Sequence, residues 1–175
     1  MDFFDVVRNR QSIRRFTEQP VRDAHLRQIL EAANRAPSAG NLQAYQVYVV
    51  RDRAIRRRLD MASGNQGAVV NASVVLVFCA LPERSAQRYG SRGEQLFCIQ
   101  DATIACAYAQ LAATALGIAS VWIGAVQEPE VMKEALGLEE DVWPIALLPL
   151  GYPDERPPRT PRRPLQELIR ECEAR

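Results

Sequence analysis

The sequence predicts a globular α/β or α+β domain built around a mixed β-sheet. Four short apolar runs rich in β-branched residues are bounded by turn residues, a pattern typical of strands. Helical patterns come first and then alternate with these runs along the chain. The length of 175 residues fits a single domain over residues 1–175, large enough to bury a core.

The predicted elements follow from local patterns. Residues 21–35 carry apolar side chains at helical spacing opposite a charged face, and residues 52–62 form a basic amphipathic helix. A third helix begins at Pro129 and ends at Gly137, in keeping with the positions that these residue types prefer. The predicted strands are residues 45–50, 73–80, 120–123 and 145–150.

The segment 101–117 predicts a helix that is apolar on all sides. Asp101 is placed to cap its start, and Gly117 is placed to end it in a left-handed conformation. A helix that is hydrophobic all round must be buried all round, which a chain this short achieves most readily with a second subunit. The sequence therefore favours a homodimer, with a central core helix as the alternative.

The segment from Tyr152 to Arg163 alternates prolines with arginines, so it predicts an extended arm and excludes a helix there. A short amphipathic helix is expected from Pro164. The C-terminal arm then covers about residues 152–175.

Composition restricts the class of protein. A net charge of +1 excludes a globally basic surface for nucleic acid. Polar residues interrupt the apolar stretches before about 18 residues, so we expect no membrane span, and an acidic N-terminus is unlike a secretory signal. We therefore expect a cytoplasmic protein. The four cysteines lack metal-ligand spacing, and Cys79 and Cys106 are expected to be buried as core residues.

The first candidate site is the segment 10–16. Arg10, Ser12 and Arg14 are spaced two residues apart, so an extended chain places all three on one face. Two guanidinium groups beside a hydroxyl offer many hydrogen-bond donors to a phosphate. The alternative is a solvated basic turn after the first helix.

Two further segments are suited to a flat ligand. The loop 36–43 carries Ser38, Asn41 and Gln43 among small residues that let a ligand approach the backbone. The segment 116–124 ends in Gly124, whose amide can face a ring. The alternatives are an ordinary helix-to-strand turn and, for Trp122, a place in the core.

Missing motifs also restrict the chemistry. The chain has no glycine-rich dinucleotide fingerprint after a strand and no phosphate-binding P-loop. Its single histidine, His25, accompanies no nucleophile signature, which argues against a hydrolytic triad. If the protein is an enzyme, a cofactor rather than a catalytic side chain or a metal is expected to carry the reaction.

Taken in order, these segments resemble the nitroreductase superfamily over residues 3–169. The resemblance rests on motifs spread along the chain rather than on any single one. They are Arg10-x-Ser12-x-Arg14-x-Phe16, the Ala36–Gln43 loop, Gln66, the Asp101 helix ending at Leu116-Gly117, the Trp122-Ile123-Gly124 turn, Leu150-Gly151-Tyr152-Pro153 and Arg162-Arg163-Pro164.

The resemblance implies an α+β fold with a central mixed or antiparallel sheet flanked by helices. It also implies an intertwined homodimer with two molecules of flavin mononucleotide (FMN) at the interface. The residues implied to bind FMN are Arg10, Gln11, Ser12, Arg14 and Arg162 at the phosphate and ribityl chain, Asn65 and Gln66 at the flavin, Ile123 and Gly124 against the ring, and Pro37, Ser38, Ala39 and Asn41 from the partner.

The activity implied by the resemblance is a ping-pong transfer of hydride. NADH or NADPH reduces the flavin, and a small acceptor such as a nitroaromatic or a quinone then takes its place. No catalytic acid or base is implied, because the flavin carries the chemistry. Residues 84–98 are the expected lid. The alternatives are a non-catalytic flavin carrier or regulator, and a specialised member acting on flavin or on a halogenated aromatic.

Overall fold

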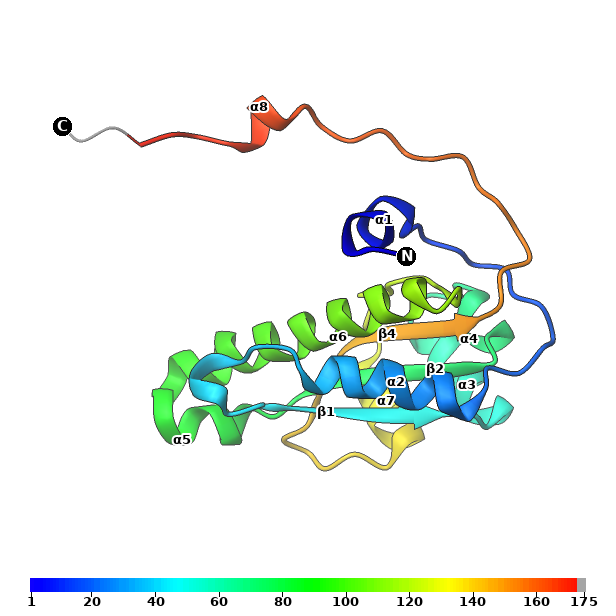
Figure 1. The fold of residues 1–175 in the computed structure, drawn as a ribbon. Helices are drawn as coiled ribbons and strands as arrows, with labels where there is room; N and C mark the ends of the chain where they lie inside the picture. The colour runs from blue at the N-terminus through cyan, green and yellow to red at the C-terminus, as the bar shows by residue number, and fades with distance from the viewer. Residues whose placement is uncertain (173–175) are drawn as a thin grey trace.

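The computed structural model describes residues 1–172, and its centre is a four-stranded sheet with helices on both faces (Figure 1). The strand order is β1-β2-β4-β3, and all neighbouring strands are antiparallel. The strands are β1 (Tyr45–Val50), β2 (Val74–Ala80), β3 (Ala119–Ser120) and β4 (Trp143–Gly151). The helices are α1 (Phe3–Asn9), α2 (Asp23–Asn34), α3 (Arg53–Ala62), α4 (Ala68–Asn71), α5 (Pro82–Arg92), α6 (Cys98–Ala115), α7 (Pro129–Leu136) and α8 (Leu165–Leu168), with single turns η1 (Ala39–Asn41) and η2 (Gly93–Phe97).

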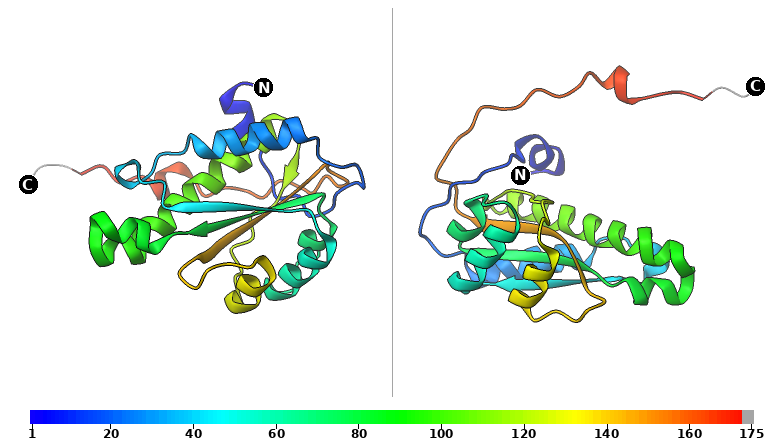
Figure 2. Two further views of the ribbon diagram at one scale, coloured as in Figure 1. Left: turned by 90° about the horizontal axis from the view of Figure 1, so that it is seen from below. Right: turned by 180° about the vertical axis from the view of Figure 1, so that it is seen from behind.

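Strand β2 lies inside the sheet, and all seven of its residues are buried. Its side chains alternate between two cores. Leu76 and Phe78 pack with residues of α2 and α6, whereas Val75 and Val77 pack with residues of α3 and α7. Each fully buried side chain of this size contributes about 1.5–3 kcal/mol, so the strand stabilises a three-layer arrangement (Figure 2).

The cysteines on this frame are core residues, as expected. Cys79 and Cys106 are buried and unbridged, and burial raises the pKa of the Cys79 thiol to about 12. Burial likewise raises the pKa of Cys106. Both thiols therefore stay protonated at neutral pH and act as small apolar side chains.

Helix α6 is the last part of a helical run, Pro82–Ala115, that begins as α5, kinks at Gly90 and passes through the π-helical turn η2. By length and composition alone the run is long and apolar enough to cross a membrane, contrary to the sequence expectation, because α5 and η2 add length to the alanine-rich segment. In the fold, Ala105, Ala109 and Ala113 pack in the core with α2 and the sheet. The apolar part of the run, α6, is therefore packed as a core helix of this domain.

The expectation that Asp101 caps this helix is wrong. Helix α6 begins at Cys98, and the preceding residue Phe97 is itself helical because η2 leads directly into α6. The π-helical turn depends on Gly93, since a Cβ there would lie 2.5 Å from the Ser85 carbonyl oxygen. The predicted end of the helix is confirmed, because Gly117 has a φ of +72°.

The other elements differ little from the predictions. The helices predicted over 21–35 and 52–62 are α2 and α3, and α7 ends at a left-handed Gly137. Strand β3 is shorter than the predicted 120–123. The chain leaves the sheet after Ser120 and returns at Ile123, which bridges to Leu147 of β4.

The two ends of the described chain extend away from the three layers. Residues 154–164 form no helix or strand, and the single turn of α8 follows Pro164, as expected. Figure 1 shows α1 and this arm on the same side of the molecule, beyond α6 and β4. This placement brings the first residues of the chain near the arm.

Candidate functional site

Residues 10–14 lie in an extended segment at the edge of the sheet. Ser12 forms a parallel bridge with Ser120, and the Ile13 amide donates to the Ser120 carbonyl at 3.0 Å. Because side chains alternate along an extended chain, Arg10, Ser12 and Arg14 border one hollow while Ile13 borders another. This is the arrangement that the spacing of two residues predicts.

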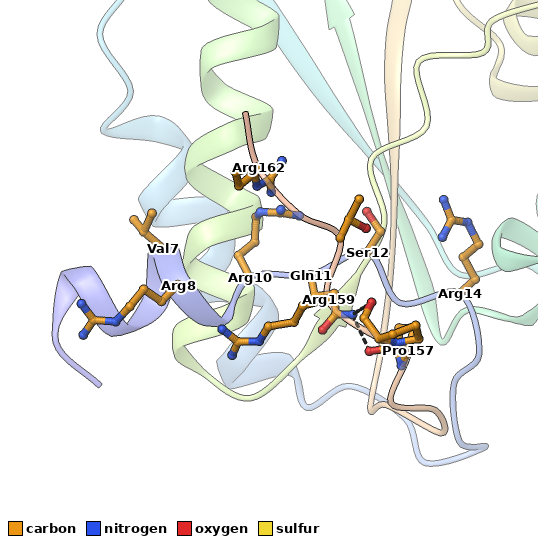
Figure 3. Close-up of a pocket in the computed structure, with 11 residues that line it drawn as sticks. Val7, Arg8, Arg10, Gln11, Ser12, Arg14, Pro157, Arg159 and Arg162 are labelled. Carbon is orange, nitrogen blue, oxygen red and sulfur yellow. Dashed lines mark hydrogen bonds between the residues drawn. The ribbon is translucent and has the colours of Figure 1, made fainter. Parts of the chain in front are cut away.

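The hollow has a volume of about 690 Å³ and collects guanidinium groups from both ends of the chain (Figure 3). In Figure 3, Arg10 and Arg162 lie close together, and Arg14 lies farther along the segment. Within residues 1–172, none of these three arginines forms an ion pair. Like charges this close repel one another, so the hollow is suited to an anion. Its lining is Val7, Arg8, Arg10, Gln11, Ser12, Arg14, Pro157, Pro158, Arg159, Thr160 and Arg162.

The arm is attached to the same segment by two side chains. The Gln11 amide nitrogen donates to the carbonyls of Pro157 at 2.7 Å and Pro158 at 3.0 Å. The Glu155 carboxylate accepts the backbone amides of Arg14 and Arg15, at 2.5 and 3.1 Å. Hydrogen bonding from the Arg14 amide in particular holds the pKa of Glu155 below its usual value. Gln11 was expected to contact a ligand, but its amide nitrogen holds the arm.

Sequence reasoning missed two arginines of the hollow. Arg159 donates to the Asn9 side chain at 2.9 Å, and Arg8 pairs with Asp5 of the same helix. The alternation of proline and arginine in the tail was the available signal for Arg159. No sequence pattern around Arg8 identifies it, because the arm that completes the hollow beside it is about 150 residues away along the chain.

A second group of expected residues lies on the α3–α4 loop and after β3. The amides of Gln127 and Glu128 donate to the Ala62 carbonyl, which joins the two segments. Asn65 adopts a left-handed φ of +53°, held by its amide to the Asp60 carbonyl at 2.8 Å. The structure therefore brings the loop with Asn65 and Gln66 beside the segment that follows Ile123 and Gly124.

Gly124 is exposed, and its amide donates to no group in the described part of the chain. Its φ is not positive, and a Cβ would meet only the Trp122 indole, at an ordinary 3.5 Å. The protein's own packing therefore does not require glycine at this position.

The third group, Pro37, Ser38, Ala39 and Asn41, lies elsewhere. The loop sits beside α5, at the N-terminal end of α6, where Asp101 accepts the Ala39 amide at 2.9 Å (Figure 1). The arginine hollow lies near Ser120, beyond the C-terminal end of the same helix. A helix of 18 residues is about 27 Å long, so one chain does not bring the two sets together.

A model described as the Nitroreductase family matches residues 7–68 and 60–152. This chain belongs to the nitroreductase family. Among curated nitroreductase relatives, it is 35% identical to "NADH dehydrogenase" of Thermus thermophilus, covering 91% of both chains. It is 34% identical to "FMN reductase [NAD(P)H]" of Bacillus subtilis, covering 91% of this chain and 68% of that protein.

Solved structures agree with this family assignment. The NADPH:FMN oxidoreductase of Vibrio harveyi, solved in complex with NAD⁺, superposes with a TM-score of 0.89 at 29% identity. The match covers 99% of this chain and 78% of that one. The nitroreductase fold therefore extends over nearly the whole sequence, including the segments that form the arginine hollow.

Proposed function

We propose that this protein is an NAD(P)H-dependent FMN oxidoreductase that works as a homodimer, with residues 1–175 acting as one domain. The observation that carries the proposal is the hollow with three guanidinium groups that no carboxylate of residues 1–172 neutralises. The names of the Bacillus subtilis and Vibrio harveyi relatives support FMN as the ligand.

The residues of the hollow fit the phosphate of FMN. Arg10, Arg14 and Arg162 supply charge, and the Ser12 hydroxyl supplies a further donor between them. A charge-assisted hydrogen bond contributes about 1.5–3 kcal/mol, so two such bonds are enough to hold a phosphate group tightly. Gln11 then acts indirectly, by holding the arm that carries Arg162 in place.

The flavin ring is expected to lie against Ile123 and Gly124, with Asn65 and Gln66 supplying amide contacts. The missing side chain at Gly124 supports this placement, because no contact or backbone angle among residues 1–172 requires glycine there. A bare backbone lets a planar ring approach closely and leaves the amide to donate to it. We expect the Gly124 amide to lie near the reactive N5 edge.

A second copy would complete the site. The Ser38–Asn41 half and the arginine half lie at opposite ends of α6, so antiparallel pairing of two α6 helices places the loop of one copy near the hollow of its partner. Ala107, Leu111 and the exposed Tyr108 lie on the outer side of α6. This half-covered apolar stripe supports the pairing.

Exposed apolar side chains of the two chain ends fit the same interface. Among residues 1–172, eight of the eleven large exposed hydrophobic residues belong to the N-terminus, α6 or the arm. Isolated exposed residues need no explanation, but a concentration on one side indicates a contact surface. The eight are Met1, Phe3, Phe4, Val7, Tyr108, Leu165, Leu168 and Ile169.

When bound, the flavin takes hydride from NADH or NADPH and passes it to an acceptor, for which we propose a nitroaromatic or a quinone. The protein's part is positional and electrostatic. The arginines fix the phosphate, Ser38 and Asn41 of the partner border the ring, and Gly124 leaves one ring edge open to a backbone donor. No side chain is needed as a proton carrier for hydride transfer itself.

We place the protein in the cytoplasm. The support is its chemistry rather than any targeting signal: Cys79, Cys98 and Cys106 are buried as free thiols, and Cys172 is exposed and unbridged. Unpaired cysteines are typical of reducing compartments. The reductant that we propose, NADH or NADPH, is a soluble intracellular coenzyme.

The decisive experiment is anaerobic mixing of the purified FMN-loaded protein with NADH and with NADPH. We expect the flavin absorbance to bleach with at least one of them and to return when a quinone or a nitroaromatic is added. Flavin that stays yellow with both coenzymes would instead favour a binding protein without turnover.

Gly124→Ala sharpens this test. The added methyl group meets only Trp122, so the melting temperature should not change. Bleaching should slow about tenfold, since a 1 Å misplacement at the reacting centre is costly. Unchanged bleaching in this variant would show that the ring lies elsewhere.

A further inference from the structure

One carboxylate lies buried in the mostly apolar helix α6. Asp101 is 1% exposed, and among the described residues no cation lies within ion-pair distance of it. Burying a charge is costly unless hydrogen bonds compensate for it. Its partners are two backbone amides: Oδ1 accepts from Ala39 at 2.9 Å, and Oδ2 accepts from Ala44 at 3.3 Å.

The two amides bracket a strained stretch of backbone. Between them, Gly40, Asn41 and Gln43 have φ values of +55°, +56° and +50°. Glycine adopts this conformation freely and asparagine tolerates it, but glutamine does so at a cost. Strained conformations persist only where surrounding contacts determine them, and they concentrate at ligand sites. Asp101 supplies such a contact at each end of the stretch.

Helix α5 holds the carbonyl side of the same loop. Arg84 donates to the Leu42 carbonyl at 2.6 Å, and Arg88 donates to the Gly40 carbonyl at 3.4 Å. The amide groups of the loop are thus bound by Asp101 of α6, and its carbonyl groups are bound by arginines of α5. Asn41 stays exposed, as does Pro37.

We propose that Asp101 is the positioning residue of the half-site that each copy presents to its partner's flavin. Through the amides of Ala39 and Ala44, its carboxylate fixes the left-handed turn and so sets where Ser38 and Asn41 lie. Residues 84–98, expected as a lid, then serve partly as the outer support of this loop. The inference rests on the proposed function, because the loop reaches a flavin only across a dimer.

The chemistry calls for aspartate rather than asparagine. A carboxylate offers an acceptor oxygen to each amide, whereas a carboxamide offers one oxygen and turns an NH₂ group toward the other amide. Asp101→Asn therefore preserves side-chain volume, but its NH₂ group faces the amide N–H of either Ala39 or Ala44, so that one hydrogen bond is lost. The change tests the contact without opening a cavity in α6.

The experiment compares the full-length wild type with Asp101→Asn. Losing a hydrogen bond to a charged group should weaken FMN binding about 10- to 100-fold, measured by fluorescence titration. The visible spectrum of the bound flavin should shift, because the ring loses fixed neighbours. Amide hydrogen exchange at Ala39 and Ala44 should become faster by a similar factor.

Asp52→Ala is the matched control. Asp52 also accepts two backbone amides, from Ala54 and Ile55, but it does so at the start of α3, on the other face of the sheet. The substitution should lower the melting temperature and leave FMN affinity and spectrum unchanged. A general loss of stability is thereby separated from a displaced loop.

A second variant removes the contact from the loop side if Asp101→Asn fails to fold. Ala39→Pro replaces the donor hydrogen by a ring carbon that faces Oδ1, so it breaks this contact at the first residue of η1, where proline fits the backbone. Ser38 already has the extended backbone that precedes proline, with φ −141° and ψ 157°. We expect weaker FMN binding and faster exchange at Ala44.

Wild-type FMN affinity and spectrum in these variants, with exchange accelerated, would overturn the proposal. Unchanged exchange in Asp101→Asn would overturn it too, because the contact would then not hold the loop. Exchange at Ala39 and Ala44 is also measured on the flavin-free protein, so it reports the Asp101 contact whether or not FMN binds. A wild-type protein that binds no FMN would therefore contradict the proposed function while the grip of Asp101 on the loop is still measured.

Discussion

The two halves of the candidate site are held in opposite ways. The arginine half is assembled from both ends of the chain, and the Gln11 amide and the Glu155 carboxylate hold it together near the surface. The loop half, Pro37–Gln43, is short in sequence and held from the core by a buried carboxylate. One half is built by long-range contacts at the surface, and the other by a buried contact.

The difference indicates that the arginine half can adjust to a ligand, whereas the loop half is held in a fixed position. Exposed polar contacts contribute little and exchange with water easily, so the arm can move as a phosphate enters. Buried hydrogen bonds in a low-dielectric environment are stronger, so the loop keeps its shape before any ligand arrives. In the proposed site, the position of the ring would thus be set in advance, and the phosphate would be enclosed on binding.

The largest effect should come from separating the halves. Tyr108→Arg places a charge in the middle of the apolar stripe of α6, and the twofold axis of the proposed dimer would bring two such charges together. We expect a mass near the 19.6 kDa of one chain by light scattering, together with loss of bound FMN. Val49→Arg, an equally drastic change at an exposed position of edge strand β1, should remain dimeric.

Next in size is the loss of a phosphate contact. Arg14→Ala should weaken FMN binding by about 1.5–3 kcal/mol, roughly 10- to 100-fold, since it removes a charge from the hollow. Flavin content after extensive dialysis is the measurement. The adjacent Arg15 borders a different hollow and pairs with Glu155, so Arg15→Ala should retain its flavin. A full FMN complement in Arg14→Ala would show that the phosphate lies elsewhere.

Local patterns were enough to predict most elements and the common face of Arg10, Ser12 and Arg14. Apolar runs rich in β-branched residues and bounded by turn residues predicted β1, β2 and β4. A spacing of two residues predicted that Arg10, Ser12 and Arg14 border one hollow, and this inference depends only on the geometry of an extended chain.

The role of Asp101 could not be predicted in the same way. An aspartate before an apolar run is a normal helix cap, and only the continuation of α5 through η2 moves it into the helix interior. The side-chain amide of Gln11 can donate to a ligand as well as to the carbonyls of Pro157 and Pro158, so the sequence does not distinguish these partners. In both cases the partner is more than 50 residues away, and residue types alone do not identify it.

A smaller effect is expected from pH, on the arginine half alone. The pKa of Glu155 is lowered in the folded chain. The stabilisation of the arm by its carboxylate is therefore present above the ordinary pKa of 4.5 and is lost as pH falls through the lowered value. FMN fluorescence should report release that begins below about pH 4.5. Glu155→Gln should hold FMN less well at neutral pH and remove this component of the pH dependence. Identical acid profiles would contradict the role of Glu155.

The smallest effect concerns strain in the loop half. Gln43→Gly relieves a left-handed φ but makes the unfolded chain more flexible, so the net gain in the free energy of unfolding should not exceed about 1 kcal/mol. Urea denaturation measures it. Gly117→Gln places a glutamine at a left-handed φ at the end of α6, so it should lower the free energy of unfolding instead. A large loss of stability in Gln43→Gly would show that its side chain, rather than its backbone, holds the turn.

If two copies share each site as proposed, the length of α6 has a genetic consequence. A copy damaged at Arg14 and a copy damaged at Asp101 carry their defects at opposite ends of the helix, so a mixed pair would contain one site with both lesions and one site with neither. Two inactive alleles expressed together should therefore complement each other. About half of the pairs formed at random would be mixed, and a quarter of all sites would be intact.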